Sequence, residues 1–366
     1  MNKNQIWVIS GAGGMTGSEM VNQIATANPS ARLILFDNGL NCDLKKVSDK
    51  FMKVLNPKDL FLGANASITL KPFYDILKVS IDKMVASFDE ERVVDSKIDL
   101  IFVNCAAIVH TKWFYQPSST FDVNVNGMRE FLRLAEQYHT SLSKGHFDVK
   151  FINCSTSEVY SMQSYKMGGV KEDDYLMLAT SEHSLRTSYA FGKLLTEMFT
   201  KEAYNQYQLP TCSIRFANVY TEDEMLPEHI IPFIIHSLTV VDPVDGKYEV
   251  HLLENAKNTM RTFLHNYDSA SAVIALATND DCLNGDCYNV GTDTEYTIAD
   301  VVYLVAKTLG IPVSQVAIKY DRPARKADPQ RRLLNCLRIQ TRTGWKPMVT
   351  LENGIARCVA AVKKIS

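Results

Sequence analysis

A tyrosine and a lysine four residues apart have the clearest chemical potential in this sequence. Tyr189 and Lys193 lie in a segment with a helical pattern, and this spacing puts both side chains on one face of a helix. An adjacent ammonium group lowers the pKa of a phenol, which would let Tyr189 remove a proton from a hydroxyl near neutral pH. The same ammonium could hold the ribose of a nicotinamide cofactor. Because the YxxxK pattern is common, the alternative is an exposed pair on an amphipathic helix.

A group of hydroxyl and carboxyl side chains follows an apolar run that indicates a strand. The run Val149–Asn153 leads into Thr156, Ser157 and Glu158. Residues at the carboxyl end of a strand in an open α/β sheet face the ligand cleft. We therefore expect Thr156 to hydrogen-bond the same oxygen that Tyr189 deprotonates. Serines in such a segment also cap turns, which is the alternative for Ser157.

A glycine-rich turn joins the first strand to the first helix. Its glycines have the spacing GxxGxxG and directly follow the apolar segment Gln5–Ser10. Residues without a Cβ permit a tight turn and let backbone N–H groups approach a pyrophosphate at the helix N-terminus. The sequence therefore predicts a dinucleotide site formed by Gly11, Gly14, Met15, Thr16 and Gly17.

A carboxylate at the end of the second strand indicates which dinucleotide binds. Asp37 follows the apolar segment Arg32–Phe36, with Asn38 beside it, and its carboxylate can accept hydrogen bonds from both ribose hydroxyls of NAD. The same charge would repel the 2′-phosphate of NADP. NAD is the expected cofactor, while Lys45 and Lys46 leave NADP open. In the alternative, Asp37 only starts a turn.

Short apolar strands alternate with helical segments through the first half of the chain, which is typical of a parallel sheet covered on both faces. Strands are expected at Gln5–Ser10, Arg32–Phe36, Asp99–Asn104, Val149–Cys154 and Thr211–Phe216, and long helices at about 119–140 and 187–206. We expect an α/β fold with a Rossmann-type doubly wound parallel sheet in residues 1–220, enlarged at about 38–98. Residues 221–366 would form mainly a smaller C-terminal substrate-binding lobe, with some elements returning to the Rossmann domain.

The composition is that of an ordinary globular protein. The chain of 366 residues is 46% hydrophobic and 22% charged, with a formal net charge of -2. This balance offers no positive field for nucleic acid or an anionic membrane, although one basic cluster could meet a phosphate: Arg322, Arg325, Lys326, Arg331 and Arg332. The eight cysteines are scattered without paired CxxC units, so no metal site is expected. Without a signal-peptide or membrane-spanning pattern, the expected location is cytoplasmic.

Taken together, the motifs resemble the NAD-dependent epimerase/dehydratase family of extended short-chain dehydrogenases/reductases over nearly the whole chain. The matching stretches are GAGGMTG, FDNG, NCAAIVH, FDVNVNG, STSEVY, YAFGK, RFANVY, MRTF, YNVG and GWKPMVTLENGI. The resemblance implies NAD that stays bound through the catalytic cycle, a nucleotide-sugar substrate, and a homodimer formed through the two long helices. It also implies catalytic roles for Thr156, Glu158, Tyr189 and Lys193, and cofactor contacts from Ala106, Ala107 and Asn124.

Within this family, several segments are similar to those of UDP-glucuronate decarboxylases. They are Glu158 in STSEVY, Arg186 in RTSYAFGK, Tyr115 in WFYQP, Arg261 in MRTF, and the stretch ADPQRR at 327–332. A 4-keto group β to a C5 carboxylate makes loss of CO2 easy, and Arg261 with Glu158 would orient that carboxylate. The expected substrate contacts are Ser157, Arg186, Asn218, Arg261 and Tyr115.

Three alternatives to decarboxylation remain. Nucleotide-sugar 4-epimerases and 4,6-dehydratases share the first step, oxidation of the sugar at C4. Ser157 stands where dTDP-glucose dehydratases carry the aspartate that expels water, which disfavours that branch. The third alternative, from another class, is a non-catalytic NAD-binding regulator; such proteins usually lose the tyrosine or the lysine, and here both are present.

Overall fold

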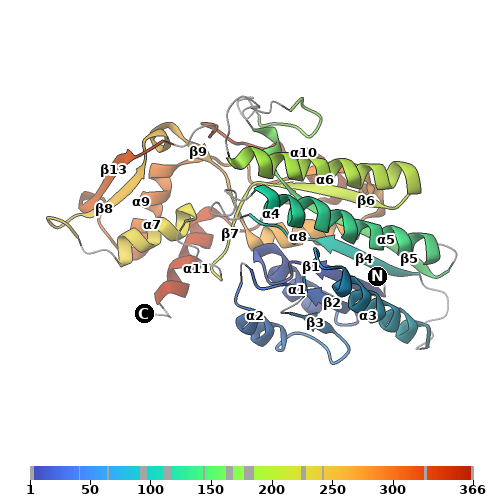
Figure 1. Ribbon diagram of the computed structural model, residues 1–366. Helices are drawn as coiled ribbons and strands as arrows, with labels where there is room; N and C mark the ends of the chain where they lie inside the picture. Colours follow the sequence, from blue (N-terminus) through green and yellow to red (C-terminus); the bar gives the residue numbers. More distant parts are fainter. Residues whose placement is uncertain are drawn as a thin grey trace.

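The computed structural model describes residues 4–40, 42–63, 66–90, 97–109, 117–142, 145–161, 168–176, 185–223, 228–240, 243–324 and 328–363. Figure 1 shows a larger lobe built around a central sheet, and beside it a smaller lobe that contains α7, α9, β8 and β13. The C-terminal helix α11 lies between the smaller lobe and the rest of the chain in this view.

Seven parallel strands form the central sheet in the order β11-β6-β5-β4-β1-β2-β3. The strand order reverses between β1 and β4, and open α/β sheets bind ligands at the carboxyl ends of the strands at such a point. The expected doubly wound Rossmann-type sheet is therefore confirmed. The strands are β1 (Gln5–Ser10), β2 (Arg32–Phe36), β3 (Leu60–Leu62), β4 (Ile98–Asn104), β5 (Phe147–Thr156), β6 (Thr211–Phe216) and β11 (Asn284–Val290).

Helices cover both faces of the sheet, and alternate residues of β1 belong to the two resulting cores. Trp7 and Ile9 pack with α1 (Met15–Ala27) and α8 (Asn266–Ala277) on one face. Ile6 and Val8 point to the other face, as the period of a strand requires. That face is covered by α3 (Lys71–Glu90), α5 (Met128–Leu142) and α6 (Leu185–Tyr207), and α2 (Leu44–Phe51) and α10 (Leu337–Thr343) complete the larger lobe.

The segment expected to be one helix over 119–140 has three parts: α4 (Pro117–Phe121), a π-helical turn (Asp122–Gly127) and α5. Within the π-helical turn, Asn124 binds both polar backbone groups of Ile108. The Ile108 N–H donates to Asn124 Oδ1 at 2.7 Å, and Asn124 Nδ2 donates to the Ile108 carbonyl at 3.1 Å. Gly127 lies against Ile68, where a Cβ would come within 2.5 Å of Ile68 Cγ1. These contacts with distant segments explain why a regular helix is interrupted here.

The smaller lobe has a hydrophobic core of its own. Ile234, Val302 and Ile355 lie in this core, on three different helices. The helix α9 begins at the capping box of Thr297 and Asp300 and ends at Gly310 in the left-handed region, so local signals define it. The remaining helices and strands are β7 (Asn218–Tyr220), α7 (Ile230–Thr239), β8 (Tyr248–Leu253), β9 (Met260–Arg261), β10 (Phe263–His265), β12 (Tyr296–Thr297), α9 (Ile298–Leu309), β13 (Val316–Arg322) and α11 (Leu351–Lys363). Short 3-10 turns occur in both lobes, at Ser157–Tyr160, Glu254–Asn258, Asp280–Cys282 and Val313–Gln315.

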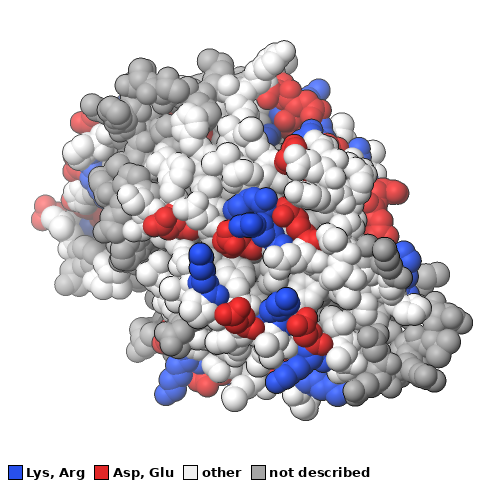
Figure 2. All heavy atoms as spheres, turned by 45° about the vertical axis from the view of Figure 1, so that its right-hand side comes forward, with Lys and Arg blue, Asp and Glu red and all other residues white. Residues whose placement is uncertain are grey.

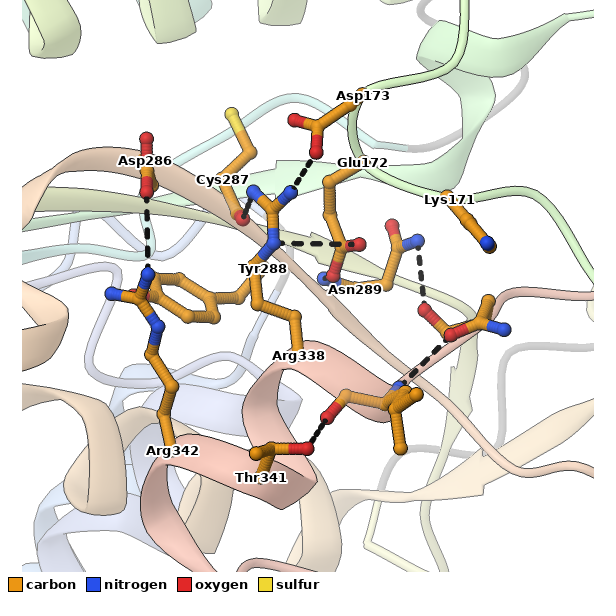
Figure 3. A network of polar contacts seen from close by, with 12 residues as sticks. Lys171, Glu172, Asp173, Asp286, Cys287, Tyr288, Asn289, Arg338, Thr341 and Arg342 are labelled. Carbon is orange, nitrogen blue, oxygen red and sulfur yellow. Dashed lines mark hydrogen bonds and ion pairs between the residues drawn. The ribbon is translucent and has the colours of Figure 1, made fainter.

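Residues 168–176 dock onto β11 and α10. Glu172 accepts a hydrogen bond from the backbone N–H of Asn289 at 2.9 Å, and Arg338 of α10 forms ion pairs with Glu172 and Asp173 (Figure 3). Val170 forms a parallel β-bridge with Leu334. This docking fixes the stretch 331–335 next to the central sheet, and that stretch contributes to the site described below.

The charged side chains on the face in Figure 2 are mixed: lysines and arginines lie among aspartates and glutamates, and wide stretches of surface carry neither. This pattern agrees with the near-neutral net charge of -2. Among the described residues, no helix combines the length and the apolar character that a membrane span requires.

Candidate active site

A cavity of about 670 Å³ lies at the reversal point of the sheet and takes residues from both lobes. Eleven of the expected cofactor residues line it, together with four of the expected catalytic or substrate residues. The first group is Gly11, Gly14, Met15, Thr16, Gly17, Asp37, Asn38, Ala106, Ala107, Tyr189 and Lys193, and the second is Thr156, Glu158, Asn218 and Arg261.

The glycine-rich turn is shaped by close backbone contacts. Gly11 has φ 64°, and a Cβ on it would come within 2.6 Å of the Ala106 nitrogen. A Cβ on Gly17 would come within 2.4 Å of the Gly11 carbonyl oxygen. Both positions therefore require glycine, whereas Gly14 meets only the Gly11 oxygen, at 3.4 Å. The turn leads directly into α1, whose N-terminus is suited to a pyrophosphate.

The Asp37 carboxylate lies at the carboxyl end of β2, in the cavity wall. It accepts hydrogen bonds from the backbone N–H groups of Gly13 at 3.0 Å and Gly39 at 2.9 Å. The Cys42 thiol lies 3.5 Å from Oδ1, the oxygen that also accepts from Gly39, and is a weak donor that a ribose hydroxyl can replace. Lys45 and Lys46 are exposed and do not line the cavity. This arrangement fits NAD better than NADP.

Thr156, Tyr189 and Lys193 meet at the end of β5. Thr156 hydrogen-bonds the Tyr189 side chain, and its Oγ1 also accepts the backbone N–H of Glu158 at 3.2 Å. Nζ of Lys193 donates to the carbonyl oxygen of Cys154 at 2.7 Å. All three side chains are buried, with Tyr189 8% exposed and Lys193 2% exposed. The three residues thus form a buried, hydrogen-bonded group in the wall of the cavity.

The protein alone does not lower the pKa of the tyrosine. Burial raises the pKa of Tyr189, the negative charge of Glu158 raises it further, and the hydrogen bond with Thr156 acts in the opposite direction. Burial also lowers the pKa of Lys193. The lowered phenol pKa expected from the spacing of Tyr189 and Lys193 is therefore not found, because burial has the largest effect on the pKa of Tyr189.

Glu158 is held by an arginine from far along the chain. Arg332 Nη1 donates to Glu158 Oε1 at 2.5 Å and Nη2 donates to Oε2 at 3.1 Å, so the pair is bidentate. Both residues line the cavity, and the Arg332 side chain is 4% exposed against 20% for Glu158. Within the described residues, Nε of Arg332 is buried without a hydrogen-bond partner. An unsatisfied buried donor costs about 1–3 kcal/mol.

Arg261 has a carboxylate partner of its own. Its Nη2 donates to Asp328 Oδ1 at 2.8 Å, and its Nη1 donates to the carbonyl oxygens of Met260 and Gln330 at 2.9 and 3.2 Å. Asn218 Nδ2 donates to the Thr262 carbonyl at 3.0 Å. The expectation that Arg261 works directly with Glu158 is therefore modified: both line the cavity, but each is paired with another residue.

Two expected site residues, Asn124 and Ser157, do not line the cavity, and the side chains of two others are not described. Asn124 is buried, does not line the cavity, and holds Ile108 in place as described above. Ser157 is 2% exposed and likewise does not line the cavity, because the 3-10 turn after Thr156 points it into the protein. Arg186 lies in α6, and its side chain is not among those described, while Tyr115 lies outside the described residues.

Several lining residues were not assigned from the sequence. Arg332 and Asp328 belong to the ADPQRR stretch, which was the available signal for them. Ala66, Ser67 and Ile68 line the cavity after β3, at the carboxyl edge of the sheet, and the short strand gave no pattern that would locate them. Among the described residues, no group of three or more potential metal ligands occurs.

A Rossmann sheet with Thr156, Tyr189 and Lys193 around a cleft shared by two lobes defines an extended short-chain dehydrogenase/reductase. The chain belongs to the NAD dependent epimerase/dehydratase family, whose sequence model matches residues 7–291. The protein is therefore an enzyme of this NAD-dependent class, and NAD is its cofactor.

Curated relatives are moderately similar to the chain. The dTDP-glucose 4,6-dehydratase of Escherichia coli is 28% identical over 259 residues, covering 66% of this chain and 67% of the relative. The dTDP-D-glucose 4,6-dehydratase of Mus musculus is 26% identical over 275 residues, covering 73% and 68%. The chain thus matches about two thirds of the length of these relatives.

Solved structures share the fold over nearly the whole chain. The dTDP-glucose 4,6-dehydratase from Bacillus anthracis in complex with NAD has a TM-score of 0.73 at 23% identity, covering 98% of this chain and 97% of that one. The UDP-glucuronic acid 4-epimerase from Bacillus cereus in complex with UDP-glucuronic acid and NAD has a TM-score of 0.74 at 18% identity, covering 99% and 100%. At these identities the comparison concerns the fold.

Proposed function

We propose that this enzyme oxidises a nucleotide-linked sugar at C4, acts on the resulting 4-keto sugar, and reduces the product again. The residues of the glycine-rich turn and Asp37 would hold NAD, which would supply the acceptor, and later the donor, of the C4 hydride. Tyr189 takes the proton of the C4 hydroxyl, with Thr156 hydrogen-bonded to the same group and Lys193 fixing the end of β5. The solved relatives bound to UDP-glucuronic acid and NAD support a nucleotide-sugar substrate.

We further propose that the substrate is UDP-glucuronate and that the product is a UDP-pentose plus CO2. The Arg332–Glu158 pair carries this assignment, because it places a buried guanidinium with one unsatisfied N–H donor in the wall of the cleft. A sugar carboxylate is an anion that could share this guanidinium with Glu158. Arg261 lies in the same wall as an ion pair with Asp328 and offers a second guanidinium near the carboxylate or the diphosphate.

The chemistry of the 4-keto sugar then favours loss of CO2. The C5–carboxylate bond breaks, its electron pair forms an enolate with the 4-keto group, and CO2 leaves. A proton then returns to C5 and the 4-keto group is reduced. Fixed positive groups stabilise the enolate oxygen because they need no reorganisation when the charge develops.

A second candidate, 4,6-dehydration, is favoured by the curated relatives, which are dTDP-glucose 4,6-dehydratases. That reaction needs an acid to expel the C6 hydroxyl as water. Ser157 cannot supply such an acid, and its side chain lies outside the cavity. For this reason we place dehydration second.

Product analysis separates these reactions. The purified protein with NAD is incubated separately with UDP-glucuronate, UDP-glucose and dTDP-glucose. The mass of each nucleotide-sugar product is measured by mass spectrometry and its configuration is determined by NMR. Decarboxylation predicts loss of CO2 from UDP-glucuronate. Loss of water from dTDP-glucose, or a 4-epimer of unchanged mass, would replace the decarboxylase assignment with the corresponding alternative.

We also propose that the enzyme is a homodimer formed through α5 and α6. Met198 on α6 is a large apolar side chain that is 61% exposed. A second copy packed on this face would cover it.

A further inference from the structure

Two cysteine thiols lie side by side where β4 and β5 end. Sγ of Cys105 is 3.5 Å from Sγ of Cys154, and both residues line the cavity that contains Tyr189 and Lys193. The strands pair Asn104 with Asn153, so the two cysteines are the next opposed residues and share one face of the sheet. Neighbouring strands lie about 4.8 Å apart, within the Cα separation of about 4.4–6.8 Å that a disulfide spans.

We propose that Cys105 and Cys154 form a reversible oxidation site that controls NAD binding. With hydrogen peroxide as the oxidant, one thiol loses its proton and the thiolate attacks one peroxide oxygen, which breaks the O–O bond and gives a sulfenic acid and hydroxide. The hydroxide takes up the proton that the thiol lost and becomes water. The second thiol then attacks the sulfenic sulfur and expels a second water molecule as the S–S bond forms. In total, two thiols lose two electrons and two protons, and one hydrogen peroxide becomes two water molecules.

The positions of these cysteines connect the bond to the cofactor site. The backbone N–H of Cys105 donates to the Ser10 carbonyl at 3.1 Å, and the next residue, Ala106, is the one on which Gly11 packs. The Cys154 carbonyl accepts the hydrogen bond of Lys193 at 2.7 Å. Closing the gap between the sulfur atoms from 3.5 Å to about 2.05 Å turns both side chains and fixes them in the wall of the cavity. Under this proposal, oxidation changes the cavity wall beside the glycine-rich turn and beside Lys193.

The surroundings of the two thiols make their oxidation slow. The hydrogen bond with Cys154 raises the pKa of Cys105, burial raises it further, Lys193 acts in the opposite direction, and Asp37 adds to the increase. Little thiolate is present near neutral pH, and the thiolate is the reacting form. The rate of oxidation should therefore rise with pH.

The test uses the full chain without a sugar. Reduced protein is treated with hydrogen peroxide, the linked peptides are identified by mass spectrometry, and NAD binding is measured by calorimetry. We expect linked peptides that contain Cys105 and Cys154 and together lack two hydrogen atoms. We also expect the NAD affinity to fall by about tenfold, which corresponds to about 1.4 kcal/mol. Dithiothreitol should restore the affinity.

Variants identify the thiols that respond. Each variant is compared with its own untreated form, so that a change in its starting affinity does not matter. Cys105→Ser and Cys154→Ser should each abolish the oxidative loss, whereas Cys42→Ser should keep it, although Cys42 lines the same cavity. The proposal is overturned if Cys42 is oxidised while no Cys105–Cys154 peptide forms, or if the linked protein binds NAD as well as the reduced one. Because NAD binding is the readout, neither result depends on the sugar substrate.

Discussion

Tyr189 is the residue on which the chemistry of the cleft depends most directly. Its hydroxyl is buried, hydrogen-bonded to Thr156, and part of the wall of the cavity. Tyr189→Phe removes the acid/base group without changing the shape of the wall, so we expect kcat to fall by at least about 100-fold with NAD binding retained. Steady-state kinetics and calorimetry measure the two effects. Tyr175→Phe is the control, because Tyr175 is 91% exposed; equal activity of the two variants would exclude Tyr189 as the acid/base.

Glu158 and Arg332 should behave as one unit. Each satisfies the other through two hydrogen bonds, so the loss of either leaves a partly buried charge in the cleft. We expect Glu158→Gln and Arg332→Met each to lower kcat/KM strongly, and the double variant to be little worse than either. The double-mutant cycle should give a coupling energy of about 0.5–3 kcal/mol.

A pair far from the cleft provides the control for this cycle. Lys97 Nζ lies 2.9 Å from Asp148 Oδ1, and the two side chains are 70% and 37% exposed. Lys97→Met should therefore leave kcat/KM unchanged. Additive effects of Glu158→Gln and Arg332→Met would show that the two residues act independently.

At the scale of the element, the turn between β1 and α1 depends on the absence of a Cβ at particular positions. Gly11→Ala forces an L-residue to φ 64° and against the Ala106 nitrogen at 2.6 Å, which should cost about 1–3 kcal/mol of unfolding free energy. Gly14→Ala meets only an oxygen at 3.4 Å and should keep its stability within about 1 kcal/mol. Urea denaturation compares the two variants, and equal stabilities would contradict this description of the turn.

The N-terminus of α8 should make stability sensitive to acid. His265 Nδ1 accepts the backbone N–H of Tyr267 at 3.1 Å, so its proton lies on Nε2, which donates to Glu222 at 2.8 Å. This hydrogen bond is the main reason why the pKa of Glu222 is lowered to about 2. Since an unfolded glutamate has a pKa of about 4.3, the contribution to stability is present above about pH 4.3 and is lost as the pH falls toward 2.

Glu222→Gln removes this titration. The free energy of unfolding of the variant should therefore fall less steeply than that of the wild type between about pH 5 and pH 3. Denaturant melts at several pH values give the two slopes. Parallel curves would mean that the hydrogen bond from His265 does not stabilise the folded protein.

At the scale of the whole molecule, the parts that were predictable from sequence are those with local signals. The alternation of apolar strands and helices predicted the sheet, and the glycine turn, Asp37 and the YxxxK pair each lie in the cavity wall as expected. The positions of these residues follow from their spacing along a single helix or from their place at the end of a single strand. The parallel sheet then brings the strand ends together at one edge.

The parts that were not predictable depend on contacts between distant segments. Arg332 reaches Glu158 across 174 positions of the sequence, through the docking of residues 168–176 and 331–335 on β11. The inward orientation of Ser157 and the contact of Asn124 with Ile108 arise in the same way, from packing around the π-helical turn and the 3-10 turn. The ADPQRR stretch marks Arg332, but no short pattern in the sequence encodes its pairing with Glu158 or the other two contacts.

Oxidation at C4 by residues of one shared cleft is the central claim, and a single-turnover experiment tests it most directly. The protein loaded with NAD is mixed rapidly with UDP-glucuronate while the absorbance of NADH is followed. We predict a rise and decay of NADH in the wild type, and no rise in Tyr189→Phe. The contrary result is that protein shown to hold NAD forms no NADH with UDP-glucuronate, UDP-glucose or dTDP-glucose. The cleft then does not oxidise these sugars at C4.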